Sequence, residues 1–160
     1  MFKTEQYSGT REKNYELVIK QIAALMEDEP NRIANLSNAS ALLNQFLDNI
    51  NWVGFYLWDG AELVLGPFQG LPACVRIPLG KGVCGSAAAE QKTIRVEDVN
   101  QFPGHIACDA ASQSEIVIPL IKEGKLIGVL DIDSPITGRF DETDERYLEK
   151  FAEQLVAKLQ

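Results

Sequence analysis

Three cysteines, Cys74, Cys84 and Cys108, lie in stretches rich in glycine or polar residues. Cys84 is part of GVCGSAAAEQ, and Cys108 is part of FPGHIACDAASQSE. A thiolate can attack an electrophilic sulfur, and a second thiol can then capture the resulting sulfenic acid as a disulfide. Because the two sulfurs must approach each other, movable segments suit this cycle better than rigid strands. An isolated cysteine is often only a small buried hydrophobe, but these surroundings favour redox chemistry.

The cysteines do not form a metal-binding pattern. Their spacings of ten and twenty-four residues differ from the paired Cys-x-x-Cys of structural zinc sites, and His105 is the only histidine. We therefore expect no metal. His105 precedes Cys108 by three residues, so it could supply a cation beside the thiol or simply hydrogen-bond within its loop.

A group of carboxylates is predicted near the end of the chain. The stretch LIGVLDIDS alternates, which places Ile127, Val129, Asp131 and Asp133 on one face of a strand. A three-residue loop, Lys122-Glu123-Gly124, would pair Ile121 with Lys125 and Glu115 with Asp131, so that Glu115 joins the other two acids. A two-residue loop would turn Glu115 to the opposite face. The cluster could be a binding site for a cation or a proton, or only a solvated strand end.

Aromatic residues of NWVGFYL form a second candidate wall. Trp52, Gly54 and Tyr56 share one face of the predicted strand. Such residues commonly pack in a core, and they could equally line a pocket for an apolar methyl or thioether group.

The hydrophobic pattern predicts an α+β sandwich in one domain, residues 1–160. Two amphipathic helices come first, one from Tyr15 to Met26 and one from Ile33 to Ile50. A hairpin around Asp59-Gly60 follows, then a strand over 75–79, a helix over 83–91 and a strand over 93–96. Residues 98–113 resemble a long functional loop. A second hairpin covers 116–121 and 126–132, and a final helix capped by Asp141 buries Tyr147, Leu148, Phe151, Leu155 and Leu159.

Composition narrows the possible functions. Fifteen Lys and Arg against twenty-three Asp and Glu give a formal charge of −8, which repels phosphate backbones and argues against nucleic acid as a partner. No apolar run is long enough for a membrane span, and the start of the chain lacks the apolar region of a signal peptide. We expect a cytoplasmic protein.

Three segments, GPFQGLPACVRIPLGKGVCGSAAA, FPGHIACDAASQSEIVIPL and GVLDIDSP, closely resemble the free methionine-(R)-sulfoxide reductases, which are stand-alone GAF domains. The resemblance covers about residues 10 to 160. It implies a GAF fold: a mainly antiparallel six-stranded sheet with the N- and C-terminal helices on one face and a loop-covered pocket on the other. It also implies reduction of free L-methionine (R)-S-oxide without a bound cofactor, with thioredoxin as electron donor, and often a homodimer.

The resemblance assigns roles by matching position. Cys108 would be the nucleophile, Cys84 the resolving cysteine and Cys74 an auxiliary thiol. The residues expected to bind the substrate are Trp52, Tyr56, Glu115, Asp131, Asp133 and the backbone N–H groups near Ile106 and Ala107. Acids beside Cys108 disfavour its thiolate, so we expect the substrate's ammonium group to offset them. A GAF ligand sensor and a thiol redox switch without a substrate are the alternatives.

Overall fold

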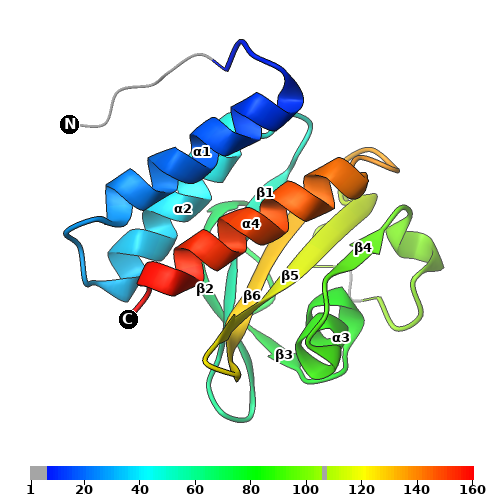
Figure 1. Cartoon of the computed structure of the whole chain (residues 1–160). Coiled ribbons are helices and arrows are strands. Elements are labelled where there is room, and N and C mark those ends of the chain that lie inside the picture. Colours follow the sequence, from blue (N-terminus) through cyan, green and yellow to red (C-terminus); the bar gives the residue numbers. More distant parts are fainter. Residues whose placement is uncertain (1–6, 106–107) are drawn as a thin grey trace.

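The computed structural model describes residues 7–105 and 108–160, and its centre is a six-stranded sheet of order β3-β2-β1-β6-β5-β4 (Figure 1). Every neighbouring pair of strands is antiparallel. The strands are β1 (Trp52–Trp58), β2 (Glu62–Gly70), β3 (Arg76–Pro78), β4 (Ile94–Val96), β5 (Ser114–Lys122) and β6 (Lys125–Ser134). β1 and β6 lie at the centre of the sheet, so their side chains are covered on both faces.

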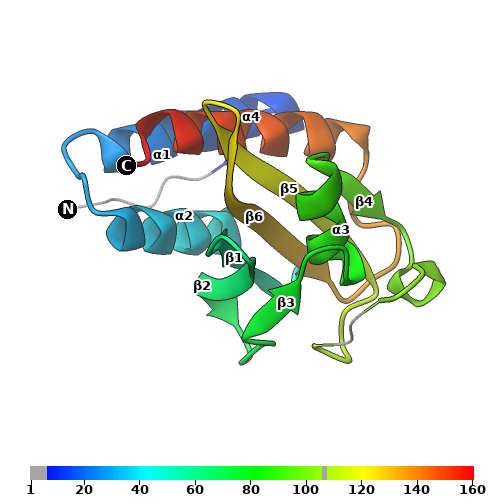
Figure 2. The same cartoon turned by 90° about the horizontal axis from the view of Figure 1, so that it is seen from below.

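Three helices cover one face of this sheet: α1 (Arg11–Met26), α2 (Arg32–Phe46) and α4 (Glu142–Lys158) (Figure 2). The alternation of β1 explains the division between faces, since Val53 and Phe55 pack against the helices while Trp52 and Tyr56 belong to a second cluster on the other face. The shorter α3 (Gly82–Glu90) packs within that second cluster. The sheet is therefore covered by large helices on one face and by α3 and loops on the other.

The helix boundaries follow from their caps. The side chain of Thr10 accepts a hydrogen bond at the start of α1, and that of Asn31 does so at the start of α2. Asp141 forms a capping box with Asp144, which confirms the predicted start of the last helix. All five residues predicted for its buried face are buried. In α2 one apolar residue of the predicted pattern is not buried: Ile33 is 65% exposed and lies on the side of the helix that faces solvent.

The β5–β6 hairpin has a different register from the expected one. Its loop is two residues long, Glu123-Gly124, with both residues in the left-handed region at φ 53° and 77°. A bulge near Leu120 and Ile121 then adds one residue to β6, and Glu115 pairs with Asp133 instead of Asp131. Because the bulge compensates for the shorter loop, Glu115 still shares a face with both aspartates.

The same bulge reverses the sides of two neighbouring residues. Ile127 packs against the helix-side core and Leu126 against the opposite cluster, which is the reverse of the assignment from alternation alone. Farther along β6 the alternation holds: Leu130 and Ile132 face the helices, and Val129 faces the other way.

In its described residues, 97–105 and 108–113, the long connection before β5 contains one short 3₁₀ turn, Val99–Gln101, and otherwise has turns and irregular backbone. Among the described residues, no helix is both long and apolar enough to cross a lipid bilayer.

Candidate active site

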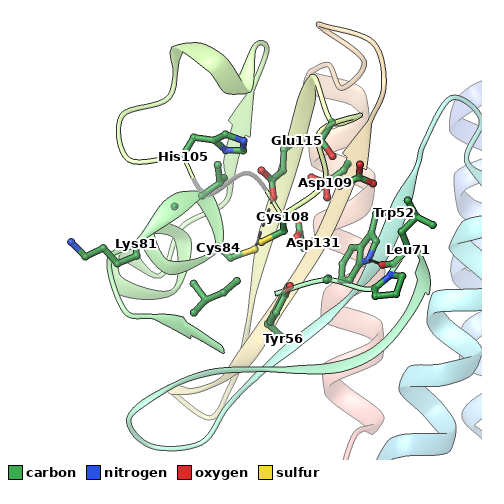
Figure 3. A pocket seen from close by; sticks show the side chains of 17 residues that line it. Trp52, Tyr56, Leu71, Lys81, Cys84, His105, Cys108, Asp109, Glu115 and Asp131 are labelled. Carbon is green, nitrogen blue, oxygen red and sulfur yellow. Dashed lines mark hydrogen bonds between the residues drawn. The ribbon is translucent and has the colours of Figure 1, made fainter. Parts of the chain in front are cut away.

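Three carboxylates meet on the sheet face opposite the large helices (Figure 3). Glu115 comes from β5, and Asp131 and Asp133 come from β6. Glu115 is 6% exposed and Asp131 is 5% exposed, while Asp133 is half-buried. The structure thus brings all three predicted acids together beside one cavity, and the reading as a solvated strand end is wrong.

Burial controls the protonation of this cluster. It raises the pKa of Glu115 well above its ordinary value, and the negative charges of Asp131 and Asp133 raise it further. Burial also raises the pKa of Asp133 well above the usual range, with Asp131 adding to the effect. The pKa of Asp131 rises through burial too, although hydrogen bonds from Glu115 and Cys84 oppose the shift. The cluster therefore retains protons at a pH where exposed carboxyls have lost theirs.

Cys84 lies against these acids, in the first turn of α3. Its Sγ is 4.0 Å from Oε2 of Glu115, and the residue is 5% exposed. Burial, followed by the charges of Asp131 and Glu115, raises the pKa of the Cys84 thiol well above its ordinary value. The next residue, Gly85, lets α3 pack closely against the end of β3, because a Cβ there would lie 2.5 Å from the carbonyl oxygen of Pro78. Cys84 is thus held as a neutral thiol, which is a weak nucleophile.

The other two cysteines form a disulfide, and one of them, Cys108, lines the cavity. Cys74 lies between β2 and β3, Cys108 lies in the loop before β5, and their Cα atoms are 5.6 Å apart. Both are half-buried, whereas Cys84 is free and buried. The bridge joins Cys108 to Cys74, whereas the resemblance assigned the resolving role to Cys84. The physical reason is that α3 fixes Cys84 beneath the acids, while Cys74 and Cys108 both lie on loops.

Two aromatic residues hold the loop that carries Cys74. Nε1 of Trp52 donates a hydrogen bond of 3.1 Å to the carbonyl oxygen of Leu71, and the hydroxyl of Tyr56 donates one of 2.9 Å to the carbonyl oxygen of Cys74. Burial raises the pKa of Tyr56, so the phenol keeps the proton that it donates. Trp52 and Tyr56 also line the cavity, with their rings stacked at 5.8 Å. They therefore form a pocket wall and anchor the Cys74 loop at the same time.

Gly54, between these two aromatics, has a packing role. A Cβ at this position would lie 2.2 Å from Cβ of Phe68, whose ring stacks on Trp52 at 5.2 Å. The space above Gly54 is filled by Phe68, so this glycine does not contribute to the pocket in the way that the sequence suggested.

Further polar residues, not predicted from the sequence, also surround the cavity. Nδ2 of Asn51 donates to Oδ2 of Asp109 at 3.0 Å and to Oγ of Ser112 at 3.1 Å. Asp109, Ser112 and Lys81 all line the cavity. Asn51 adjoins Trp52 and Asp109 adjoins Cys108, and this adjacency to residues already selected was the only signal in the sequence. His105 lines the cavity as well, and its buried Nδ1 has no hydrogen-bond partner within residues 7–105 and 108–160.

Comparison with known proteins places this site in a family. The family model for the GAF domain matches residues 31–159. The chain is 52% identical over 155 residues to the free methionine-R-sulfoxide reductase of Escherichia coli, covering 97% of this chain and 89% of that protein. The structure of a free methionine-R-sulfoxide reductase from Neisseria meningitidis, in complex with its substrate, has a TM-score of 0.94 and 46% identity, covering 99% of this chain and 95% of that one. The chain belongs to the free methionine-R-sulfoxide reductase family of GAF domains.

A third relative from the same family is also close. The substrate complex of fRMsr from Staphylococcus aureus has a TM-score of 0.88 and 57% identity, and the match covers 98% of this chain and 100% of that one. The predicted GAF fold is confirmed. Two residues that the resemblance assigned to substrate binding, Ile106 and Ala107, lie outside the described residues.

Proposed function

We propose that this protein reduces free L-methionine (R)-S-oxide to L-methionine, using Cys108 as the nucleophile. The observation that carries the proposal is the meeting, beside one cavity, of a cysteine pair joined as a disulfide with a buried cluster of carboxyls. Both features suit a small zwitterionic sulfoxide, and the family to which the chain belongs supports the choice of substrate.

In the first step the thiolate of Cys108 attacks the sulfur of the sulfoxide, and the oxygen moves to the enzyme. A carboxyl supplies the proton that the departing oxygen needs, so methionine and the sulfenic acid of Cys108 are the products. Glu115 and Asp133 are suited to this role because burial raises the pKa of both. The pocket thus holds the acid before the substrate arrives.

In the second step Cys74 attacks the sulfenic acid, which releases water and forms the Cys74–Cys108 disulfide. The observed disulfide supports Cys74 in the resolving role, in place of the auxiliary role that the resemblance implied. Cys84 would then remain a thiol throughout. Its burial and its high pKa make it a poor attacking group.

The substrate has two charged groups and an apolar methyl group to place. Its ammonium group would sit against Glu115, Asp131 and Asp133, and its methyl group against Trp52 and Tyr56. Backbone N–H groups near Ile106 and Ala107 would hold its carboxylate. The positive charge of the ammonium would lower the pKa of the Cys108 thiol and produce the thiolate mainly in the complex.

A dithiol protein must restore the enzyme, and we propose thioredoxin for this step. The two cysteines of the Cys74–Cys108 disulfide are half-buried, and Leu71 and Val75, on either side of Cys74, are 65% and 61% exposed. Such apolar surface suits contact with a protein reductant. From the sequence pattern and composition we also propose a single domain over residues 1–160 and a cytoplasmic location, and from the resemblance a homodimer.

The decisive experiment measures methionine formed from the separate R and S epimers of free methionine sulfoxide, with thioredoxin, its reductase and NADPH. We expect turnover of the R epimer and its loss in Cys108→Ser. Binding of the sulfoxide without methionine formation would instead indicate a ligand sensor. Disulfide formation without binding of the sulfoxide would indicate a redox switch.

A further inference from the structure

We propose that the base of the cavity is a binding site for zinc, formed by Cys84, Glu115 and Asp131. The thiol sulfur and one carboxylate oxygen from each acid all lie within 4.8 Å of one another. Two ligands of a tetrahedral zinc ion are about 3.5 Å apart, as Zn–S and Zn–O bond lengths require. Small rotations of the side chains are therefore enough to bring the three donor atoms onto one ion.

Asp131 provides a separate indication of a ligand. It is 5% exposed and lines the cavity, yet its Oδ1 has no hydrogen-bond partner in the described part of the chain. A buried carboxylate oxygen without a partner has a large desolvation cost, which a bound cation would offset. The unpartnered oxygen thus belongs to one of the three residues whose donor atoms already converge.

The donor set selects the metal. A thiolate with two carboxylates suits zinc or cobalt, whereas magnesium and calcium require oxygen ligands throughout. Binding displaces the thiol proton of Cys84, because a coordinating sulfur is a thiolate. Three protein ligands leave the fourth position for water.

The site would regulate the proposed reaction, and this consequence rests on the proposed function. Zinc would occupy the position that Glu115 and Asp131 offer to the substrate's ammonium, so metal and substrate would compete. The Cys74–Cys108 disulfide does not include any of the three ligands. The metal can therefore bind to the oxidised enzyme as well as to the reduced one.

The oxidised protein gives the sharpest test, because Cys84 is then the only one of the three cysteines that is free. Cobalt titration should produce a thiolate-to-metal absorption band that saturates at one ion per chain, and zinc should remove the band. Magnesium and calcium should not. Absence of the band would overturn the proposal, and this measurement does not depend on any reductase activity.

The ligands can be identified by measuring the zinc affinity of variants by calorimetric titration. Cys84→Ser and Asp131→Asn should each weaken zinc binding at least about tenfold, while Asp109→Asn should change it less than twofold. Asp109 is a matched control, since it lines the same cavity but is not one of the three ligands. Equal losses in Asp109→Asn and Asp131→Asn would refute a specific site. Should Asp131→Asn fail to fold, zinc must still protect Cys84 of the oxidised wild type from alkylation, and unprotected Cys84 would refute the site.

Discussion

Glu115 lies directly opposite Asp133 in the register of β5 and β6, and the two residues share their face with Asp131. Burial raises the pKa of both residues above their values in an unfolded chain; the charges of Asp131 and Asp133 raise that of Glu115 further, and the charge of Asp131 raises that of Asp133, against a hydrogen bond from Glu115 that lowers it. Above about pH 4 these two groups therefore hold more protons in the folded protein than in the unfolded chain, and their contribution to the free energy of unfolding falls as the pH rises. The acid cluster is stabilising only at low pH, which indicates that it is maintained for function.

Glu115→Gln should remove part of this pH dependence. We expect the stability of the variant relative to wild type to increase between pH 4 and pH 8, by about 1.4 kcal/mol for each unit by which the pKa of Glu115 is raised. Urea unfolding of both proteins at several pH values measures this difference in stability. Glu153→Gln, an exposed glutamate of α4, is the control and should show no such trend. A constant difference between Glu115→Gln and wild type would contradict a raised pKa.

Cys74→Ser should separate the two chemical steps. We expect one equivalent of methionine at close to the wild-type rate, followed by arrest, because no thiol on a neighbouring loop can capture the sulfenic acid of Cys108. Rapid quenching measures the first turnover, and dimedone labelling followed by mass spectrometry detects the sulfenic acid. In Cys84→Ser the Cys74–Cys108 disulfide should still form. Loss of that disulfide in Cys84→Ser would instead return the resolving role to Cys84.

Alternation in the sequence was sufficient to group the acids and the aromatics, because one face of a central strand must differ from the other. It did not give the hairpin register. Glu123 in a left-handed conformation is unusual, and a bulge leaves no clear mark in the pattern. The predicted loop and the actual loop plus bulge differ by two residues in register, an even number, so the face of Glu115 was right although its partner was wrong.

The cysteine pairing could not be derived from spacing, since any two of three thiols on different segments could meet. What decides it is the rigid position of α3, where Gly85 packs against the carbonyl of Pro78 and fixes Cys84 below the acids. For Trp52 and Tyr56, the sequence predicted a place in the pocket wall but not the anchoring of the Cys74 loop. Their hydrogen bonds to the backbone of the Cys74 loop depend on tertiary structure that a strand pattern does not contain.

Tyr56→Phe tests whether the hydroxyl positions the Cys74 loop. Its hydrogen bond to the carbonyl oxygen of Cys74 is worth about 1 kcal/mol, so we expect disulfide formation to slow about fivefold. Methionine release in the first turnover should change less, because the ring that faces the cavity is retained. Stopped-flow and quenched reactions separate the two rates. Tyr147→Phe, on α4 within the opposite core, is the matched loss of a phenol and should leave both rates intact.

Leu71→Ser should impair reduction by thioredoxin selectively. The side chain of Leu71 is 65% exposed beside the disulfide loop, while its carbonyl oxygen is held by Trp52, so the backbone should stay in place when the side chain changes. Loss of about 1 kcal/mol of apolar contact with the reductant raises the KM for thioredoxin about fivefold. Turnover supported by dithiothreitol should be unaffected, which distinguishes a docking defect from a catalytic one. Ile33→Ser, equally 65% exposed but on α2 at the far face of the sheet, should leave the KM for thioredoxin unchanged, and a similar rise there would show that the effect is general.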